Sequence, residues 1–143
     1  MIRIRQLRKD DYDRLIDLWN EAGLDYRPNG RDRRASIEGQ IDGPTSLFLA
    51  AEEEDRIVGV ILGTHDGRRG WINRLAVAPE SRRKGIARAL VEAVEARLEA
   101  LGIGIVTCLI EDWNAGSMTF FKGLDYVEHP ECVYYSKRMR PDV

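Results

Sequence analysis

The chain has little cysteine and no spacing of cysteine and histidine that is typical of a metal site. Cys108 and Cys132 are its only cysteines among 143 residues, they do not form a CxxC pair, and two scattered histidines accompany them. The sequence therefore predicts neither a disulfide nor a metal centre. Neither is needed, because a chain of this length buries roughly two-thirds of the surface that it exposes when unfolded. Cys108 lies in an apolar run, which is typical of a buried, reduced thiol.

Long hydrophobic runs are also missing. No stretch approaches the roughly 20 apolar residues that span a bilayer. The first five residues, which include Arg3 and Arg5, lack the apolar block of a secretory signal. We therefore expect a cytoplasmic protein that does not enter a membrane.

An excess of charge of one sign is lacking as well. The chain has 22 lysines and arginines against 24 aspartates and glutamates, which leaves a formal net charge of −2. A general nucleic-acid-binding protein usually carries a basic excess or a concentrated basic stripe, so we expect no nucleic-acid partner. Repeats, low-complexity tracts and flexible linkers are absent too, which predicts one domain over residues 1–143.

The first half of the chain alternates short strand and helix patterns. Residues 2–7 nearly alternate apolar and charged side chains, as in a strand. Asp10 is predicted to cap a helix over residues 12–22 that ends at Gly23. A weaker helix is expected around residues 33–41. Apolar runs at 47–51 and 57–62, followed by the Asp66-Gly67 turn and a strand at 71–77, predict an antiparallel meander.

The second half contains the strongest helical period. Apolar residues line one face of residues 86–101, and Gly102 follows. The compact apolar run 103–110 predicts a buried strand, parallel to 71–77 through a helical crossover. A short helix near 114–123, a final strand near 133–139 and an optional short strand near 126–128 complete the expectation. The fold class is therefore α/β (α+β), with a mixed sheet and helices on its faces.

One segment combines a strand, a loop of cations and a helix start. Arg82, Arg83 and Lys84 directly precede Gly85 and the long helix. Unpaired backbone N–H groups and the positive end of the helix dipole meet at such a place, and glycine lets a phosphate approach the backbone. This pattern indicates a diphosphate site. The alternative is a basic helix start that faces water.

Arg82-x-x-Gly85-x-Ala87, preceded by Leu75-Ala76-Val77-x-Pro79, resembles the acyl-CoA-binding motif of the GNAT superfamily of N-acetyltransferases. The order of elements is similar to the family's over nearly the whole chain. The segments 46–51 and 66–70 resemble the small bacterial acetyltransferases of the YpeA type. The resemblance implies a mostly antiparallel sheet that splays between its fourth and fifth strands. It also implies acetyl-CoA as co-substrate and transfer of its acetyl group to a primary amine of a small molecule or protein.

The resemblance also implies which residues bind the cofactor. The pantetheine arm would bond to backbone groups of Leu75 and Val77, and the diphosphate would rest on the start of the long helix. Asn114 would bond near the pantetheine or cap its own helix, or do both. The implied cofactor-binding set is Leu75, Ala76, Val77, Arg82, Arg83, Lys84, Gly85, Ile86, Ala87, Asn114, Ser117 and Phe121.

The sequence lacks one of the catalytic residues that many members of the family have. The backbone N–H of Val77 would stabilise an oxyanion, and Glu111 or Asp112 would serve as the base, although both also suit a solvated strand end. His65 is a third candidate base, with a plain turn role as its alternative. Phe121 stands where many family members have a tyrosine acid, which leaves Tyr126, Tyr134 and Tyr135 as other hydroxyl donors. A non-catalytic or weakly catalytic acyl-CoA-binding module is therefore the alternative function.

The acceptor and the assembly are the least defined features. Arg27, Arg31, Arg33 and Arg34 either attract an acidic acceptor or form a solvated helix face. Trp19, Trp71 and Trp113 are candidates to line the site, although core packing is favoured for Trp19. The apolar segment 133–135 suggests a homodimer through the terminal strand.

Overall fold

The computed structural model describes all 143 residues and contains one five-stranded sheet with helices on both faces. Its strands are β1 (Ile2–Gln6), β2 (Ser46–Glu53), β3 (Arg56–His65), β4 (Gly70–Val77) and β5 (Val106–Cys108). Its helices are α1 (Tyr12–Ala22), α2 (Arg34–Ile41), α3 (Ile86–Ala100) and α4 (Ala115–Gly123), with 3-10 turns at Lys9–Asp11 and Pro79–Ser81. No helix has the length and apolar character that a membrane crossing requires.

The strands lie in the order in which they occur along the chain, from β1 to β5. Neighbours among the first four strands pair antiparallel, and β5 pairs parallel with β4 because α3 crosses over between them. The predicted mixed, mostly antiparallel sheet is therefore confirmed.

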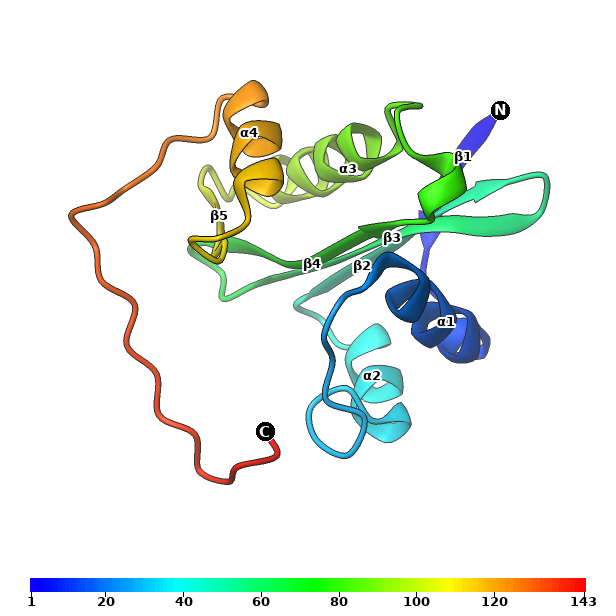
Figure 1. Cartoon of the computed structure of the whole chain (residues 1–143), viewed down its shortest axis with the longest axis horizontal. Helices are drawn as coiled ribbons and strands as arrows, with labels where there is room; N and C mark the ends of the chain where they lie inside the picture. Colours follow the sequence, from blue (N-terminus) through cyan, green and yellow to red (C-terminus); the bar gives the residue numbers. More distant parts are fainter.

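Two hydrophobic cores lie on opposite faces of the sheet. Successive residues of β2 divide between them, since Phe48 and Ala50 join one core while Leu49 and Ala51 join the other. The first core packs under α1 and α2, and the second packs under α3 and Phe121 of α4. Figure 1 shows α3 and α4 on one side of the sheet and α1 and α2 on the other.

Glycine lets α3 approach the sheet closely. A Cβ added to Gly59 of β3 would lie 2.9 Å from Cγ2 of Ile86 and 3.2 Å from Cδ1 of Leu90. A side chain at this position would push the start of α3 away from the sheet. The first turn of α3 is thus held directly against β3, next to the end of β4.

The sheet opens between β4 and β5. Their pairing covers only three residue pairs, of which the last joins Ile72 to Cys108, while β4 continues to Val77. The register of β3 against β4 shifts at the same place, so that Leu62 lies opposite Arg74 and Gly63 opposite Ile72. Asn73 is the extra residue of this bulge, which bends β4 where β5 leaves it. The splay predicted between the fourth and fifth strands is confirmed.

Several local predictions are wrong. The strand expected over 103–110 extends only from Val106 to Cys108. Asp10 does not cap α1. Instead, the carboxylate of Asp11 accepts the Arg8 N–H at 2.7 Å and pairs with Arg5 at 2.8 Å, which ties the start of α1 to β1.

The final strand expected over 133–139 is absent, and so is the optional strand near 126–128. Residues 124–143 contain no helix or strand and run from α4 toward the loop before α2 (Figure 1). Tyr134 and Tyr135 are 69% and 87% exposed. The alternating pattern alone does not form a strand, because its N–H and C=O groups need a neighbouring strand to bond to.

Candidate functional site

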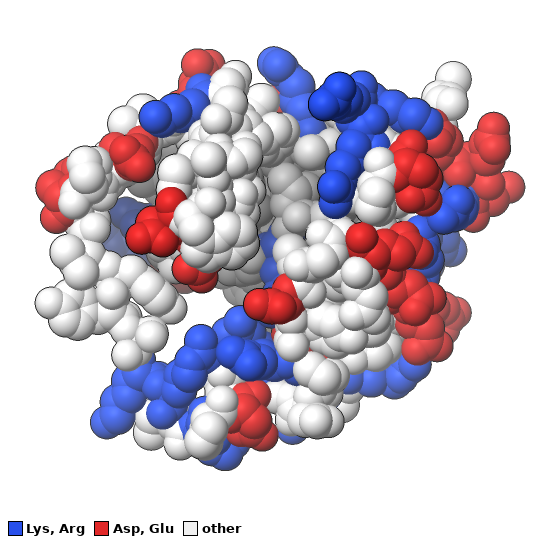
Figure 2. All heavy atoms as spheres, in the orientation of Figure 1, with Lys and Arg blue, Asp and Glu red and all other residues white.

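A large cleft occupies the opening between β4 and β5. Its volume is about 1210 Å³, and it is bounded by β4, the start of α3, the residues after β5, α4 and residues 22–31. Figure 2 shows the surface hollowed at this place, with basic side chains at both ends of the hollow. The predicted cofactor residues line this cleft with one exception, Lys84.

The edge of β4 supplies unpaired backbone groups to the cleft. The N–H of Ala78 donates to the carbonyl of Val58 at 2.8 Å, so this N–H points toward β3. Because N–H directions alternate along a strand, the N–H groups of Leu75 and Val77 point the other way, where β5 has left the sheet. The carbonyl of Val77 accepts a bond from Nε of Arg82 at 3.4 Å. The N–H of Val77 is therefore a donor without a strand partner.

The start of α3 closes one end of the cleft. Gly85 has φ +77° and precedes the first helical residue, and a Cβ placed on it would meet no atom within 4 Å. The space in front of the helix start is therefore open, and the first N–H groups of the helix point into it. Arg82 and Arg83 line the cleft and form no ion pair. Lys84 instead pairs with Glu53 at 3.2 Å, outside the cleft.

The start of α4 forms the opposite wall. The side-chain carbonyl of Asn114 accepts the N–H of Ser117 at 3.1 Å, so Asn114 caps this helix and lines the cleft as well. Phe121 is buried and makes an edge-to-face contact with Tyr126, with ring centroids 5.0 Å apart. The hydroxyl of Tyr126 donates to Oε2 of Glu95 at 2.7 Å, and burial raises the pKa of Tyr126. Tyr126 therefore holds α4 against α3 and does not line the cleft.

The candidate bases separate in the structure. Glu111 lines the cleft just beyond β5, whereas Asp112 does not. His65 also lies outside it, where Nδ1 accepts the N–H of Gly67 at 3.0 Å, so the turn role expected as its alternative is the observed one. Trp19 is fully buried in the core, as favoured, Trp71 does not line the cleft, and Trp113 lines it with most of its surface exposed.

No local sequence pattern predicts the buried ion pair that lies beside the cleft. Nη2 of Arg74, on β4, lies 2.7 Å from Oδ2 of Asp32, and the two side chains are 11% and 5% exposed. The Arg74 guanidinium stacks 4.8 Å from the ring of Trp19, and Oδ2 of Asp32 also accepts the Arg27 N–H at 2.6 Å. Arg74 is a cation within a mostly apolar strand, which indicates a specific role, but its partner lies 42 residues earlier.

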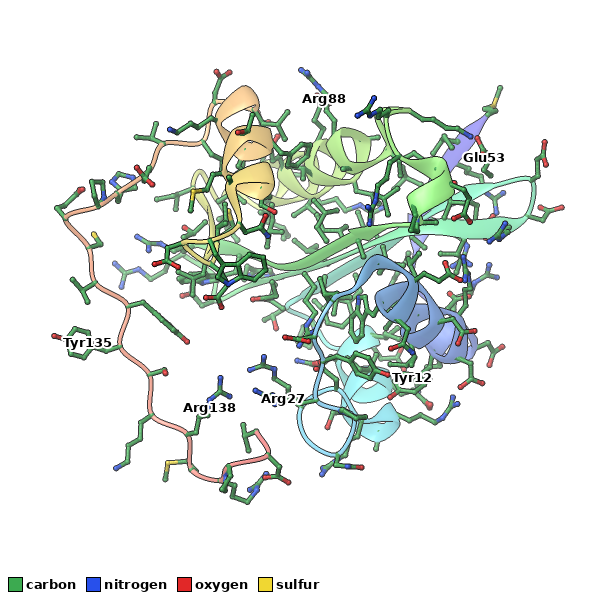
Figure 3. All side chains as sticks on the ribbon, in the orientation of Figure 1. Tyr12, Arg27, Glu53, Arg88, Tyr135 and Arg138 are labelled. Atoms are coloured by element: carbon green, nitrogen blue, oxygen red, sulfur yellow. The ribbon has the colours of Figure 1, made fainter.

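The arginine-rich run 27–34 divides between two environments. Arg27 and Arg31 line the cleft at the end opposite α3. Arg34 pairs with Asp13 and stacks over Tyr12, and Arg33 is exposed outside the cleft. Arg138 of the C-terminal segment also lines the cleft, and Figure 3 shows it on the same side as Arg27.

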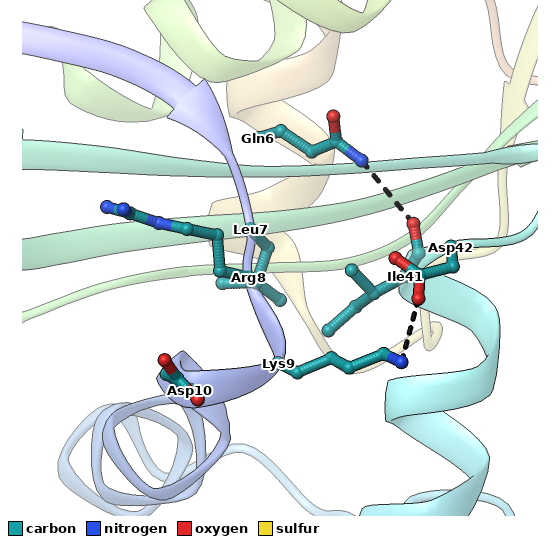
Figure 4. Close-up of a pocket in the computed structure, with 7 residues that line it drawn as sticks. All are labelled: Gln6, Leu7, Arg8, Lys9, Asp10, Ile41 and Asp42. Carbon is teal, nitrogen blue, oxygen red and sulfur yellow. Dashed lines mark hydrogen bonds and ion pairs between the residues drawn. The ribbon is translucent and has the colours of Figure 1, made fainter.

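A second pocket lies where β1 meets α2 (Figure 4). Its volume is about 360 Å³, and its polar groups bond mainly to one another. Nζ of Lys9 pairs with Asp42 at 2.8 Å, and Nε2 of Gln6 donates to the carbonyl of Ile41 at 3.4 Å. We therefore assign the chemistry to the larger cleft.

Residues 3–126 match the Acetyltransferase (GNAT) family. The chain belongs to the GNAT family of acetyltransferases. An acetyltransferase from Photorhabdus laumondii is 36% identical to it over 142 residues, which cover 99% of this chain and 98% of that protein. The expected family and acyltransferase class are therefore confirmed, and acetyl-CoA is the co-substrate from which this GNAT protein transfers the acetyl group.

Solved structures show the same fold at low identity. A PaiA N-acetyltransferase from Thermoplasma acidophilum in complex with coenzyme A gives a TM-score of 0.78 at 20% identity, with 87% of this chain and 88% of that chain covered. An aminoglycoside N-acetyltransferase in complex with CoA gives 0.79 at 18% identity, with 96% and 95% covered. The fold of this chain is thus shared with proteins of low sequence identity.

The half-buried Cys108 reports on the cleft. It lines the cleft at the last paired residue of β5, and burial raises the pKa of its thiol to about 11. Because the thiolate reacts with iodoacetamide, we expect alkylation of Cys108 to be slow at pH 8 and to accelerate until the pH approaches 11. Acetyl-CoA should slow alkylation of Cys108 and leave the exposed Cys132 unaffected, as followed by peptide mass spectrometry. Equal protection of both cysteines, or of neither, would contradict binding of acetyl-CoA in this cleft.

Proposed function

We propose that acetyl-CoA lies in the cleft with its pantetheine arm along the open edge of β4. The arm bonds to the backbone groups of Leu75 and Val77 in the place that a paired β5 would fill, and the diphosphate rests on the start of α3. Arg82 and Arg83 supply charge that no protein carboxylate neutralises. The observation that carries this proposal is one continuous cleft that joins an unpaired strand edge to a glycine-started helix.

The reaction is direct acetyl transfer to a primary amine. The neutral amine attacks the thioester carbonyl, a carbon–nitrogen bond forms, and the oxyanion accepts a hydrogen bond from the N–H of Val77. Collapse breaks the carbon–sulfur bond, and CoA leaves as a thiolate. Glu111 is the carboxylate that takes the amine proton, directly or through water, because it lines the cleft and Asp112 does not. Phe121 cannot donate a proton, so solvent protonates the thiolate.

The cell location follows from the co-substrate. Acetyl-CoA is produced inside the cell, and both cysteines of this chain are free thiols, which persist in a reducing compartment. We therefore assign the reaction to the cytoplasm.

Substitution of Gly85 tests the placement of acetyl-CoA. Gly85→Leu should weaken acetyl-CoA binding at least roughly tenfold, about 1.4 kcal/mol, because the side chain fills the space above the helix start. Gly102→Leu is the matched control, since Gly102 also has a positive φ (+81°) and open space, but follows the far end of α3. Calorimetric titration should show near-normal affinity in Gly102→Leu only. Equal loss in both variants would show strain rather than obstruction.

Turnover separates the enzyme from the alternative binding module. Release of free CoA thiol in the presence of a primary amine, with mass-spectrometric detection of the acetylated product, establishes transfer. Binding of acetyl-CoA without product from any amine would favour the non-catalytic module that Phe121 permits.

We also propose that the protein forms a homodimer through its C-terminal segment. Val133, Tyr134 and Tyr135 are 69–87% exposed, and Figure 3 shows Tyr135 pointing away from the rest of the chain. β5 is the last strand of the sheet, so its outer edge has no partner strand. If residues 133–135 of each copy paired with the β5 edge of the other copy, the exposed apolar side chains and the open strand edge of both copies would be covered.

Light scattering tests the dimer. The wild-type protein should elute at about twice 16.3 kDa, and the double variant Tyr134→Lys/Tyr135→Lys should elute as a monomer. Leu101→Lys, which changes an exposed apolar residue at the end of α3, is the control that should remain dimeric. A wild-type monomer at high concentration would contradict the proposal.

A further inference from the structure

The lining of the cleft is strongly basic although the chain is slightly acidic. Seven arginines and two carboxylates line it, in a chain of formal net charge −2. The arginines are Arg27, Arg31, Arg74, Arg82, Arg83, Arg88 and Arg138, and the carboxylates are Asp25 and Glu111. This concentration of one charge on the wall of a cavity raises the local concentration of anions there.

The basic residues form two groups at opposite ends of the cleft. Arg82, Arg83 and Arg88 surround the start of α3, where the proposed function places the phosphates of acetyl-CoA. Arg27, Arg31 and Arg138 come from the loop before α2 and from the C-terminal segment, and Figure 3 shows Arg27 and Arg138 on the side of the sheet opposite Arg88. We call the second set, together with Arg74, the acceptor-end arginines.

Three of the acceptor-end arginines, Arg27, Arg31 and Arg74, are close enough to influence one another. Burial lowers the pKa of Arg74, and the charges of Arg31 and Arg27 lower it further, while Asp32 opposes this shift. The charge of Arg74 is balanced by Asp32 at 2.7 Å. Arg27 and Arg31 have no such partner, because neither forms an ion pair with a carboxylate of the chain. The charges of Arg27 and Arg31 are thus not paired with a carboxylate of the chain.

Hydrogen bonds hold the loop that carries Arg27 and Arg31. Asp32 holds the Arg27 N–H at 2.6 Å, its own carbonyl accepts the Tyr12 hydroxyl at 2.7 Å, and Arg74 donates to the carbonyl of Asp25. Arg33 and Arg34 of the same run lie outside the cleft, whereas Arg27 and Arg31 line it. Arg27 and Arg31 are therefore not simply part of a solvated helix face. These hydrogen bonds set the backbone positions of the loop.

We propose that this end of the cleft selects an amine acceptor that carries carboxylate groups. Arginine binds carboxylate through two parallel charge-assisted hydrogen bonds, which would orient the amine toward the thioester as well as bind it. The same charges repel a polycation such as an aminoglycoside, despite the fold shared with an aminoglycoside acetyltransferase. This inference rests on the proposed function, because it assumes that acetyl-CoA fills the other end.

Matched acceptors test the charge preference. Acetyl transfer, followed by release of CoA thiol, would be compared for aspartate against asparagine and for Ala-Asp-Ala amide against Ala-Asn-Ala amide. The acidic member of at least one pair should have a kcat/KM at least roughly tenfold higher, and the pair that responds distinguishes a free amino acid from a peptide end. Kanamycin, a polycation, should react more slowly than either acidic compound. Equal rates within both pairs, or a preference for kanamycin, would overturn the inference.

Charge-removing variants locate the preference. Arg27→Gln and Arg31→Gln should each raise KM for the acidic acceptor roughly three- to tenfold and reduce the preference for it by the same factor, and the double variant should abolish the preference. Arg33→Gln removes a neighbouring exposed arginine that does not line the cleft and should change neither value. A preference that survives in Arg27→Gln/Arg31→Gln would contradict the assignment to these side chains.

Calorimetric titration with acetyl-CoA distinguishes failure of the acceptor preference from failure of the proposed function. If acetyl-CoA binds to the wild type and to both arginine variants, and acetyl transfer shows no preference for carboxylates, the inference fails and the proposed function stands. If acetyl-CoA binds and no compound of the panel is acetylated, the inference also fails. If acetyl-CoA does not bind the wild type, the proposed function fails first.

Discussion

The site depends on the separation of β5 from β4 after Ile72. The bulge at Asn73 bends β4 where its last bridge to β5 ends, and the remaining strand presents backbone groups that no neighbour satisfies. An exposed strand edge of this kind needs either solvent or an extended ligand. The crossover helix α3 starts directly after the same strand, so the unpaired edge and the glycine-started helix lie on one path. One topological feature thus supplies both parts of the proposed cofactor site.

The other wall of the cleft depends on a buried charge pair. Arg74 projects from β4 onto the face that carries α1, where it meets Trp19 and Asp32. A buried ion pair contributes little net stability, but loss of one partner commonly costs about 3–5 kcal/mol. Its role here is positional, because Asp32 also holds the backbone of the loop that carries Arg27 and Arg31. The charged end of the cleft is therefore attached to the same strand that forms the cofactor edge.

Local patterns predicted most of the fold, and the family resemblance named residues that, except for Lys84, line the cleft. The apolar period of α3, the glycine that precedes it and the meander before it depend on neighbours in sequence, and the structure contains all of them. The predictions fail where partners are distant. The strand expected over 133–139 has no neighbouring strand to pair with, and Arg74 acquires its role from Asp32, which no local pattern connects to it. Lys84 is predicted to bind the cofactor and Asp112 to serve as a base because their sequence neighbours fit these roles, but neither side chain lines the cleft.

The central claim is that the open edge of β4 and the start of α3 form one binding surface for acetyl-CoA. Calorimetric titration with acetyl-CoA and with ADP tests it most directly, because ADP carries the diphosphate and lacks the pantetheine arm. Acetyl-CoA should bind substantially more tightly than ADP, and at about 100 times its dissociation constant it should stabilise the fold by about 2.7 kcal/mol. Equal affinities would show that only the helix start binds ligand and would contradict the role of the strand edge.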